Sequence, residues 1–193
     1  MRTLEVIRDE VKSCTKCSLH ASRTNTVFSR GNPEAALCFV GEAPGEDEDL
    51  QATPFVGRSG KLLDETITAL GLDPAKDIYV CNIIKCRPPG NRRPEEAEVN
   101  ACIEYLEQQL DLVNPPVIVS LGATATSELV ITNLGITKIR GRFFKCRLPI
   151  LYKRQTVVMP TYHPSYVLRN GGKGPVYDDF KKDLESAINK SKE

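Results

Sequence analysis

Four short apolar runs, separated by helix-like segments, constrain the fold of this 193-residue chain more than any other feature. The runs span Ala36–Val40, Ile78–Ile84, Val117–Leu121 and Thr156–Met159. Uninterrupted apolar stretches of this length are typical of strands that are buried on both faces of a sheet. Because strands and helices alternate along the chain, the strands are expected to lie parallel. We predict an α/β fold, a three-layer α/β/α sandwich with a central four-stranded parallel sheet, in a single domain over residues 1–193.

Helical spacing and end signals mark the segments between these runs. Leu4, Ile7 and Val11 recur at helical spacing behind Thr3, a residue type that favours the cap position. Ser59 is expected to cap a further helix, two more helices are expected to begin at Pro94 and at Ala123, and a closing helix is expected over 176–188. Residues 41–49 are expected to form a polar loop, and residues 143–151 an irregular or hairpin excursion.

Three polar motifs follow three of the predicted strands. They are Gly41-Glu-Ala-Pro-Gly-Glu-Asp-Glu-Asp49, Asn82-Ile-Ile-Lys-Cys-Arg-Pro-Pro-Gly-Asn91 and His163-Pro-Ser-Tyr-Val-Leu-Arg169. In open parallel sheets, ligands bind beyond the carboxyl ends of the strands. We therefore expect the three motifs to meet at one rim of the sheet and to form one site.

Four of the seven cysteines can be brought together to close one metal site. Cys14 and Cys17 are separated by two residues, a spacing that lets two thiolates bind one ion or cluster. Cys86 lies inside the second motif and Cys102 lies one helix further on. Such a site would fix the N-terminal arm to the loop beyond the second strand. Zinc is one alternative for the metal, although the 15 residues between Cys86 and Cys102 differ from the short knuckles of zinc ribbons.

Composition indicates a cytoplasmic protein with no membrane contact. No apolar run approaches the roughly 20 residues needed to span a bilayer, and the charged start is unlike a signal peptide. We interpret the remaining cysteines, Cys38, Cys81 and Cys146, as free thiols.

The net charge of +1 conceals an asymmetry, because no acidic residue lies between Glu128 and Asp178. A long acid-free segment favours an electrostatic footprint for a polyanion such as nucleic acid. Its cations are Lys138, Arg140, Arg142, Lys145, Arg147, Lys153, Arg154, Arg169 and Lys173.

The ordered motifs, together with Pro54-Phe-Val-Gly57 and the four cysteines, resemble the family 4 uracil-DNA glycosylases, the thermostable iron–sulfur type. The resemblance covers the chain from Cys14 to Arg169. It implies a repair enzyme that flips deoxyuridine out of DNA and hydrolyses its N-glycosidic bond, which releases uracil and leaves an abasic site. It also implies a structural [4Fe–4S] cluster on Cys14, Cys17, Cys86 and Cys102. The protein is expected to be a monomer and to bind uracil-containing DNA. Enzymes that repair abasic sites are expected as downstream partners.

Roles in base recognition and catalysis follow from side-chain chemistry and from this resemblance. The amide of Asn82 can accept from the imino hydrogen of uracil and donate to the adjacent carbonyl. Phe55 is expected to stack on the flipped ring, and the backbone amides of Glu42 and Ala43 to bind a uracil carbonyl. His163 is expected to donate a hydrogen bond to the carbonyl that becomes negative as the base leaves.

The sequence offers several candidates for the group that orients the attacking water. Glu48 is the first choice, Glu42, Glu46 and Asp47 are further candidates, and Glu48 is alternatively a block to the methyl group of thymine. Asn91 is a candidate to orient whichever group serves. In a further alternative, DNA phosphates and the departing uracil anion stabilise the sugar cation and little base catalysis is needed.

Contacts to the DNA backbone are expected around the same site. The helix start that contains Ser59 can bind a phosphate through its amides, and Arg92 and Arg93, with Arg87, can do likewise. Val167 or Leu168 is expected to enter the space that the flipped base leaves, with Arg169 reaching the backbone.

Two other classes of protein remain as alternatives. One is a uracil-DNA binding protein with a structural metal cluster that is non-catalytic or captures its target covalently; the loop over residues 90–95 has no histidine, which argues against capture. The other is a redox protein that uses the cluster for electron transfer, which gives no reason for His163 or Asn82.

Overall fold

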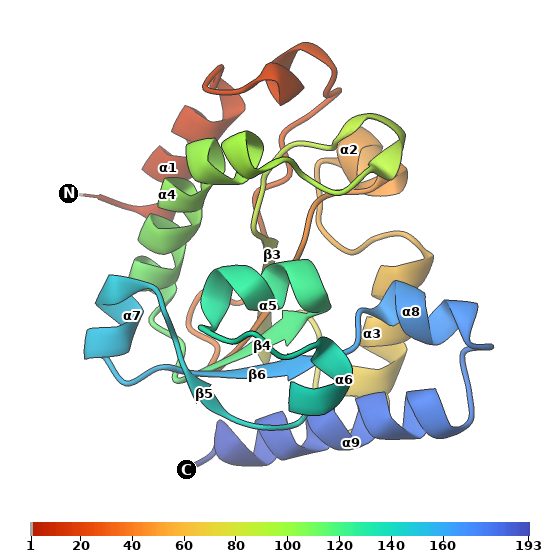
Figure 1. Cartoon of the computed structure of the whole chain (residues 1–193). Coiled ribbons are helices and arrows are strands. Elements are labelled where there is room, and N and C mark those ends of the chain that lie inside the picture. The colour runs from red at the N-terminus through yellow and green to blue at the C-terminus, as the bar shows by residue number, and fades with distance from the viewer. Residues whose placement is uncertain (1) are drawn as a thin grey trace.

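A six-stranded sheet lies at the centre of the computed structural model, which describes residues 2–193 (Figure 1). The strand order is β1-β3-β2-β4-β6-β5. The strands are β1 (Arg30–Gly31), β2 (Leu37–Gly41), β3 (Ile78–Asn82), β4 (Val117–Leu121), β5 (Phe144–Lys145) and β6 (Val157–Thr161). The four inner strands are mutually parallel, which confirms the predicted sheet, and β1 and β5 add short antiparallel edges.

Helices cover both faces of the sheet, which confirms the three-layer arrangement (Figure 1). The helices are α1 (Leu4–Lys12), η1 (Ser18–Ala21), α2 (Glu46–Gln51), α3 (Arg58–Ala69), η2 (Pro89–Asn91), α4 (Glu96–Val113), α5 (Ala123–Leu129), α6 (Ile136–Ile139), α7 (Pro149–Lys153), α8 (Pro164–Arg169) and α9 (Pro175–Lys190). Alternate residues of β2 point to opposite faces: Cys38 and Val40 pack with α4, α5 and α7, and Leu37 and Phe39 with α3, α8 and α9.

Three local predictions need correction. The segment 41–49 is not only a loop, because α2 begins at Glu46 and the Glu48 side chain accepts from the N–H of its cap residue, Gly45. Helix α3 is capped by Gly57 rather than by Ser59, and α4 by Glu95 rather than opening at Pro94. Of the two alternatives for the excursion over 143–151, the hairpin is wrong, because the segment contains the single edge strand β5 and the start of α7.

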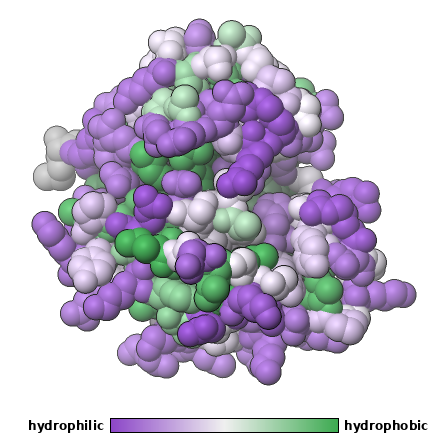
Figure 2. Space-filling view, in the orientation of Figure 1, coloured by the Kyte–Doolittle hydropathy of each residue, from purple (hydrophilic) through white to green (hydrophobic). Residues whose placement is uncertain are grey.

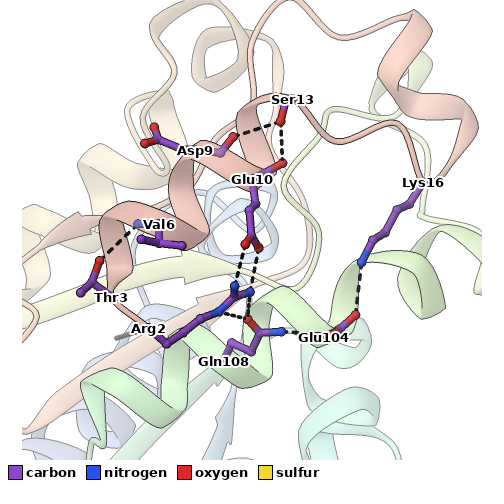
Figure 3. Close-up of polar contacts among 9 residues, drawn as sticks. All are labelled: Arg2, Thr3, Val6, Asp9, Glu10, Ser13, Lys16, Glu104 and Gln108. Atoms are coloured by element: carbon purple, nitrogen blue, oxygen red, sulfur yellow. Dashed lines mark hydrogen bonds and ion pairs between the residues drawn. The ribbon is translucent and has the colours of Figure 1, made fainter.

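The N-terminal arm is held against α4, as Figure 3 shows. Thr3 caps α1 by accepting from the N–H of Val6, as its position predicts. Lys16 pairs with Glu104 of α4 at 3.2 Å, and Arg2, which pairs with Glu10 inside the arm at 2.6 Å, donates to Gln108 of α4 at 2.8 Å. Exposed pairs of this kind contribute about 0–1 kcal/mol each, so the contact depends mainly on the buried apolar cluster of α1, which contains Ile7, Val11, Phe28 and Tyr105.

Hydrophilic residues cover most of the face seen in Figure 2, and hydrophobic residues form small separate patches on it. None of the helices within residues 2–193 has both the length and the apolar character of a membrane-spanning segment.

A buried ion pair fixes the carboxyl end of β6, where the third motif begins. The carboxylate of Asp183, on α9, accepts from the hydroxyl of Thr161 at 2.7 Å and from Arg140 at 2.9 and 2.7 Å. The Asp183 residue is 4% exposed. Removing one partner of a buried pair leaves the other charge unpaired and costs about 3–5 kcal/mol.

Asp183→Ala should therefore lower the free energy of unfolding by about 3 kcal/mol, measured by urea titration. Asp179→Ala is the matched control: its carboxylate contacts the same arginine at 3.3 Å, but the side chain is 47% exposed. We expect the control to lose less than about 1 kcal/mol. Equal losses in both variants would contradict this account of how β6 is anchored.

Candidate active site

A cleft of about 730 Å³ opens at the carboxyl ends of the four parallel strands. Its lining comes from the segments after β2, β3, β4 and β6 and from the start of α3. The predicted residues Glu42, Ala43, Glu48, Phe55, Ser59, Asn82, Arg92, His163 and Arg169 all line it. The three motifs therefore meet at one rim of the sheet, as the sequence predicts.

Asn82 presents an unpaired acceptor in this cleft. It is the last residue of β3 and is 1% exposed. Its side-chain oxygen has no hydrogen-bond partner within residues 2–193. An unpaired buried polar group costs about 1–3 kcal/mol, so a ligand that brings an N–H to this oxygen would be favoured.

Gly41 makes room for the Asn82 side chain. Gly41 lies beside Asn82 in the parallel register of β2 and β3. A Cβ at this position would lie 2.4 Å from the Asn82 oxygen and 2.5 Å from the Phe55 ring. Any larger residue would displace one of these side chains.

Phe55 is held in a strained conformation, with φ of 55° in the left-handed region. A non-glycine residue in this region costs about 1–2 kcal/mol. The carboxylate of Glu48 holds the following segment, because Oε1 accepts from the N–H groups of Val56 at 3.0 Å and Gly57 at 2.8 Å. Oε2 accepts from Gly45 N–H at 3.1 Å, so both oxygens of Glu48 bind backbone amides.

The geometry around His163 determines where its ring carries hydrogen. Nδ1 accepts from the backbone N–H of Ser165 at 3.1 Å and lies 2.8 Å from the Ser165 hydroxyl. A nitrogen that accepts has no hydrogen, so the neutral ring carries its hydrogen on Nε2. Burial lowers the pKa of His163 to about 4, and the charge of Arg169 adds to this. At neutral pH His163 is therefore an uncharged donor whose ring centroid lies 5.9 Å from that of Phe55.

Of the arginines predicted to contact DNA, some are exposed and others already bind side chains of the protein. Arg93 and Arg169 are exposed. Arg92 is bound to Glu98 at 2.9 and 2.6 Å, and Arg87 contacts Asn91 at 2.7 Å, so both help to shape the loop between β3 and α4.

Val167 does not fit its predicted role. It is 0% exposed and packs in the core beneath α8, so it cannot enter DNA in this conformation. Leu168, the alternative prediction, is partly exposed on the same helix.

The acid-free stretch is not one continuous footprint for a polyanion. Acidic residues from other parts of the chain neutralise some of its cations, as Asp183 and Asp179 do for Arg140 and Asp111 does for Arg154. Of the nine cations, only Arg169 lines the cleft within the described residues. Sequence alone could not reveal this, because the pairs join residues more than 30 positions apart.

Sequence reasoning missed one wall of the cleft. Gly122, Ala123 and Thr124 line it directly after β4, a position that the strand-end rule could have indicated. Gly122 has φ of 88°, and a Cβ there would lie 3.0 Å from that of His163. The role of Ser165 in orienting His163 was missed as well.

A second cavity brings the four predicted metal ligands together. Cys14, Cys17, Cys86 and Cys102 line it along with His20, Arg23 and Lys85. Arg23 donates to the sulfur of Cys86 at 3.2 Å. Burial raises the pKa of Cys102 to about 11, and the charge and backbone N–H of Lys85 oppose this effect.

The donor set fits a metal centre with sulfur ligands. Four thiols around one cavity are the ligand set of an iron–sulfur cluster or of zinc. No group of three or more His, Cys, Asp or Glu side chains in residues 2–193 is arranged to hold one metal ion. The four thiols around this cavity are compatible with either kind of centre.

Comparison with known proteins gives consistent matches over nearly the whole chain. The profile of the Uracil DNA glycosylase superfamily matches residues 28–190. A type-4 uracil-DNA glycosylase of Thermotoga maritima is 47% identical, over 86% of this chain and 84% of its own length. The type-4 enzyme of Sulfurisphaera tokodaii is 44% identical over 97% and 86%, and that of Saccharolobus solfataricus 42% identical over 98% and 89%.

The lowered pKa of His163 predicts a specific dependence of stability on pH. Between the unfolded value of about 6.5 and the native value of about 4, the unfolded chain binds more protons than the native protein. Stability is therefore lost as pH falls through this window, by about 2 kcal/mol from this residue between about pH 7.5 and pH 5. His163→Gln lacks this contribution, so the stability difference between wild type and variant should change by that amount in urea titrations. A constant difference would show that the native ring protonates like an exposed one.

Proposed function

This chain belongs to the type-4 uracil-DNA glycosylases of the uracil-DNA glycosylase superfamily, and we propose that it removes uracil from DNA. It hydrolyses the N-glycosidic bond of deoxyuridine and leaves an abasic site for base excision repair. The observation that carries the proposal is the buried, unpaired side-chain oxygen of Asn82 in a cleft that also contains Phe55 and the Nε2 hydrogen of His163.

Recognition of uracil follows from the hydrogen-bonding pattern of its edge. The Asn82 oxygen accepts the imino hydrogen of uracil, a donor that cytosine lacks at this position. Cytosine would leave the oxygen unpaired and place a second acceptor against it, at a cost of about 1–3 kcal/mol for each unpaired group. Phe55 stacks on the flipped ring, and the backbone at Glu42 and Ala43, which lines the cleft, receives a uracil carbonyl.

Bond cleavage depends on stabilising the charge of the departing base. The bond between C1′ of the sugar and N1 of uracil breaks, and its electron pair goes to uracil, where negative charge collects on the neighbouring carbonyl. His163 donates its Nε2 hydrogen to that carbonyl, which stabilises the transition state more than the ground state. A water molecule adds to C1′ and loses a proton, and the uracil anion takes up a proton, which gives neutral uracil and the abasic sugar.

Glu42 is our choice to orient the water, since it is a partly buried carboxylate that lines the cleft. Glu48 was the first choice from sequence, but both of its oxygens bind backbone amides. We assign Glu48 to positioning Phe55. Glu46 and Asp47 are exposed members of the same wall.

DNA contacts surround the cleft. The N-terminus of α3 faces the cleft. Its N–H groups, including that of Ser59, favour the binding of a phosphate. Arg93 and Arg169 are exposed cations that reach the DNA backbone. Arg92 contributes only in part, because its guanidinium is already paired with Glu98. Leu168 fills the space that the flipped base leaves.

The four cysteines hold a [4Fe–4S] cluster in this proposal. When bound, the cluster supplies a cross-link between the N-terminal arm, the segment after β3 and α4, and it takes no part in the reaction. The enzyme is proposed to act as a monomer in the cytoplasm, ahead of the enzymes that process abasic sites.

A uracil-release assay tests the function. A labelled duplex with a single uracil should yield free uracil and strand scission after alkali, whereas a cytosine duplex should yield neither. A retained protein–DNA adduct would instead support covalent capture, and absence of all products would leave a binding or redox protein. His163→Ala should lower turnover about 10²–10³-fold, the usual effect of losing one such donor, with DNA affinity largely kept. Unchanged turnover would remove His163 from the mechanism.

Substitution of a cluster ligand tests the cofactor separately. Cys86→Ala should lose visible absorbance and thermal stability together, because binding free energy of a structural metal site is also folding free energy. Cys146→Ala is the control, since Cys146 is equally a buried cysteine but does not line the cysteine cavity. The control should keep its colour. A wild-type protein that stays colourless after anaerobic reconstitution with iron and sulfide would contradict the cluster.

A further inference from the structure

Lys85 is a fully buried lysine that lies beside the cysteine cavity. It is 1% exposed. Its Nζ donates to the backbone oxygen of Asn82 at 2.7 Å and to the side-chain oxygen of Gln109 at 2.6 Å, and it lies 5.8 Å from the centre of the Phe28 ring. Two acceptors and one aromatic face account for the three N–H groups of an ammonium.

No carboxylate balances this charge. Among residues 2–193, no Asp or Glu forms an ion pair with Lys85, and both of its acceptors are neutral. Gln109 cannot serve as an anion, and its own amide nitrogen is committed to Tyr79 and to the Phe28 backbone. A buried charge is retained when a partner of opposite sign is close.

The neighbours that can supply negative charge are the cysteines. Lys85 lines the same cavity as Cys86 and Cys102. Four thiolates bring four negative charges, which an iron–sulfur core only partly offsets. The same ammonium is bonded to the backbone of Asn82, whose side chain lines the cleft.

We propose that Lys85 is a positioning residue that couples the two sites, a step that rests on the proposed function. Its ammonium is the buried counter-charge of the cluster, and its hydrogen bond to Asn82 fixes the end of β3 where uracil is read. Loading of the cluster and binding of uracil should then depend on each other, although the cluster takes no part in bond cleavage.

Lys85→Met tests this coupling, since methionine fills a similar volume without charge or donor. We expect iron to be released to a chelator about tenfold faster, and KM for the uracil duplex to rise about tenfold with kcat largely kept. Lys16→Met is the matched control, because Lys16 lines the same cavity but is 47% exposed and paired with Glu104 (Figure 3). The control should change neither quantity.

Two further measurements separate coupling from a general loss of stability. Asp183→Ala destabilises the opposite face of the sheet and should leave iron release unchanged. In the wild type, saturating free uracil should slow iron release, and cytosine should not, which tests the coupling even where Lys85→Met fails to fold. Normal iron release and KM in a folded Lys85→Met protein, or no effect of uracil on the wild type, would overturn the inference. A wild type that releases no uracil from DNA would instead overturn the proposed function.

Discussion

The parallel register of β2 against β3 is the constraint on which the site depends. It places Gly41 directly beside Asn82, and the missing side chain of Gly41 leaves the volume that the Asn82 amide and the Phe55 ring occupy. A shift of the register by one residue would turn the side chain of Asn82 to the other face of the sheet. The position of the Asn82 amide in the cleft is therefore set by backbone pairing before any loop is placed.

The acidic segment after β2 serves mainly to hold backbone in place. Glu48 accepts from three amides and so stabilises the left-handed Phe55, while Asp49, 2% exposed, accepts from the amides of Thr24 and Asn25. Four acids in the first turn of α2 are also favoured by the helix dipole. Carboxylates close to a polyanion would be unfavourable as isolated charges, but these two are stabilised by hydrogen bonds from N–H groups of the protein itself.

The sequence was sufficient for features that follow from local pattern and was insufficient for features that follow from packing. Apolar runs revealed the four inner strands, and strand-end motifs revealed Asn82 and His163. The edge strands β1 and β5 have two residues each and carry no periodic pattern. The burial of Val167 depends on how α8 rests on the core, and the tautomer of His163 depends on the position of Ser165. Neither could be inferred from spacing.

The short segment from Asn82 to Cys86 joins the cleft to the cysteine cavity. Residues at its two ends serve the cleft and the cysteine cavity respectively, and Lys85 bonds back across the segment to Asn82. The role proposed for Asn82 needs a rigid segment, because a small displacement of its amide loses hydrogen-bond geometry. Elsewhere in the chain, strand β6 obtains this rigidity from the buried pair of Asp183 and Arg140. After β3, the pair of Arg92 and Glu98 holds the loop close to the start of α4, and the four proposed thiol ligands, on three separate elements, can restrain the segment that precedes it.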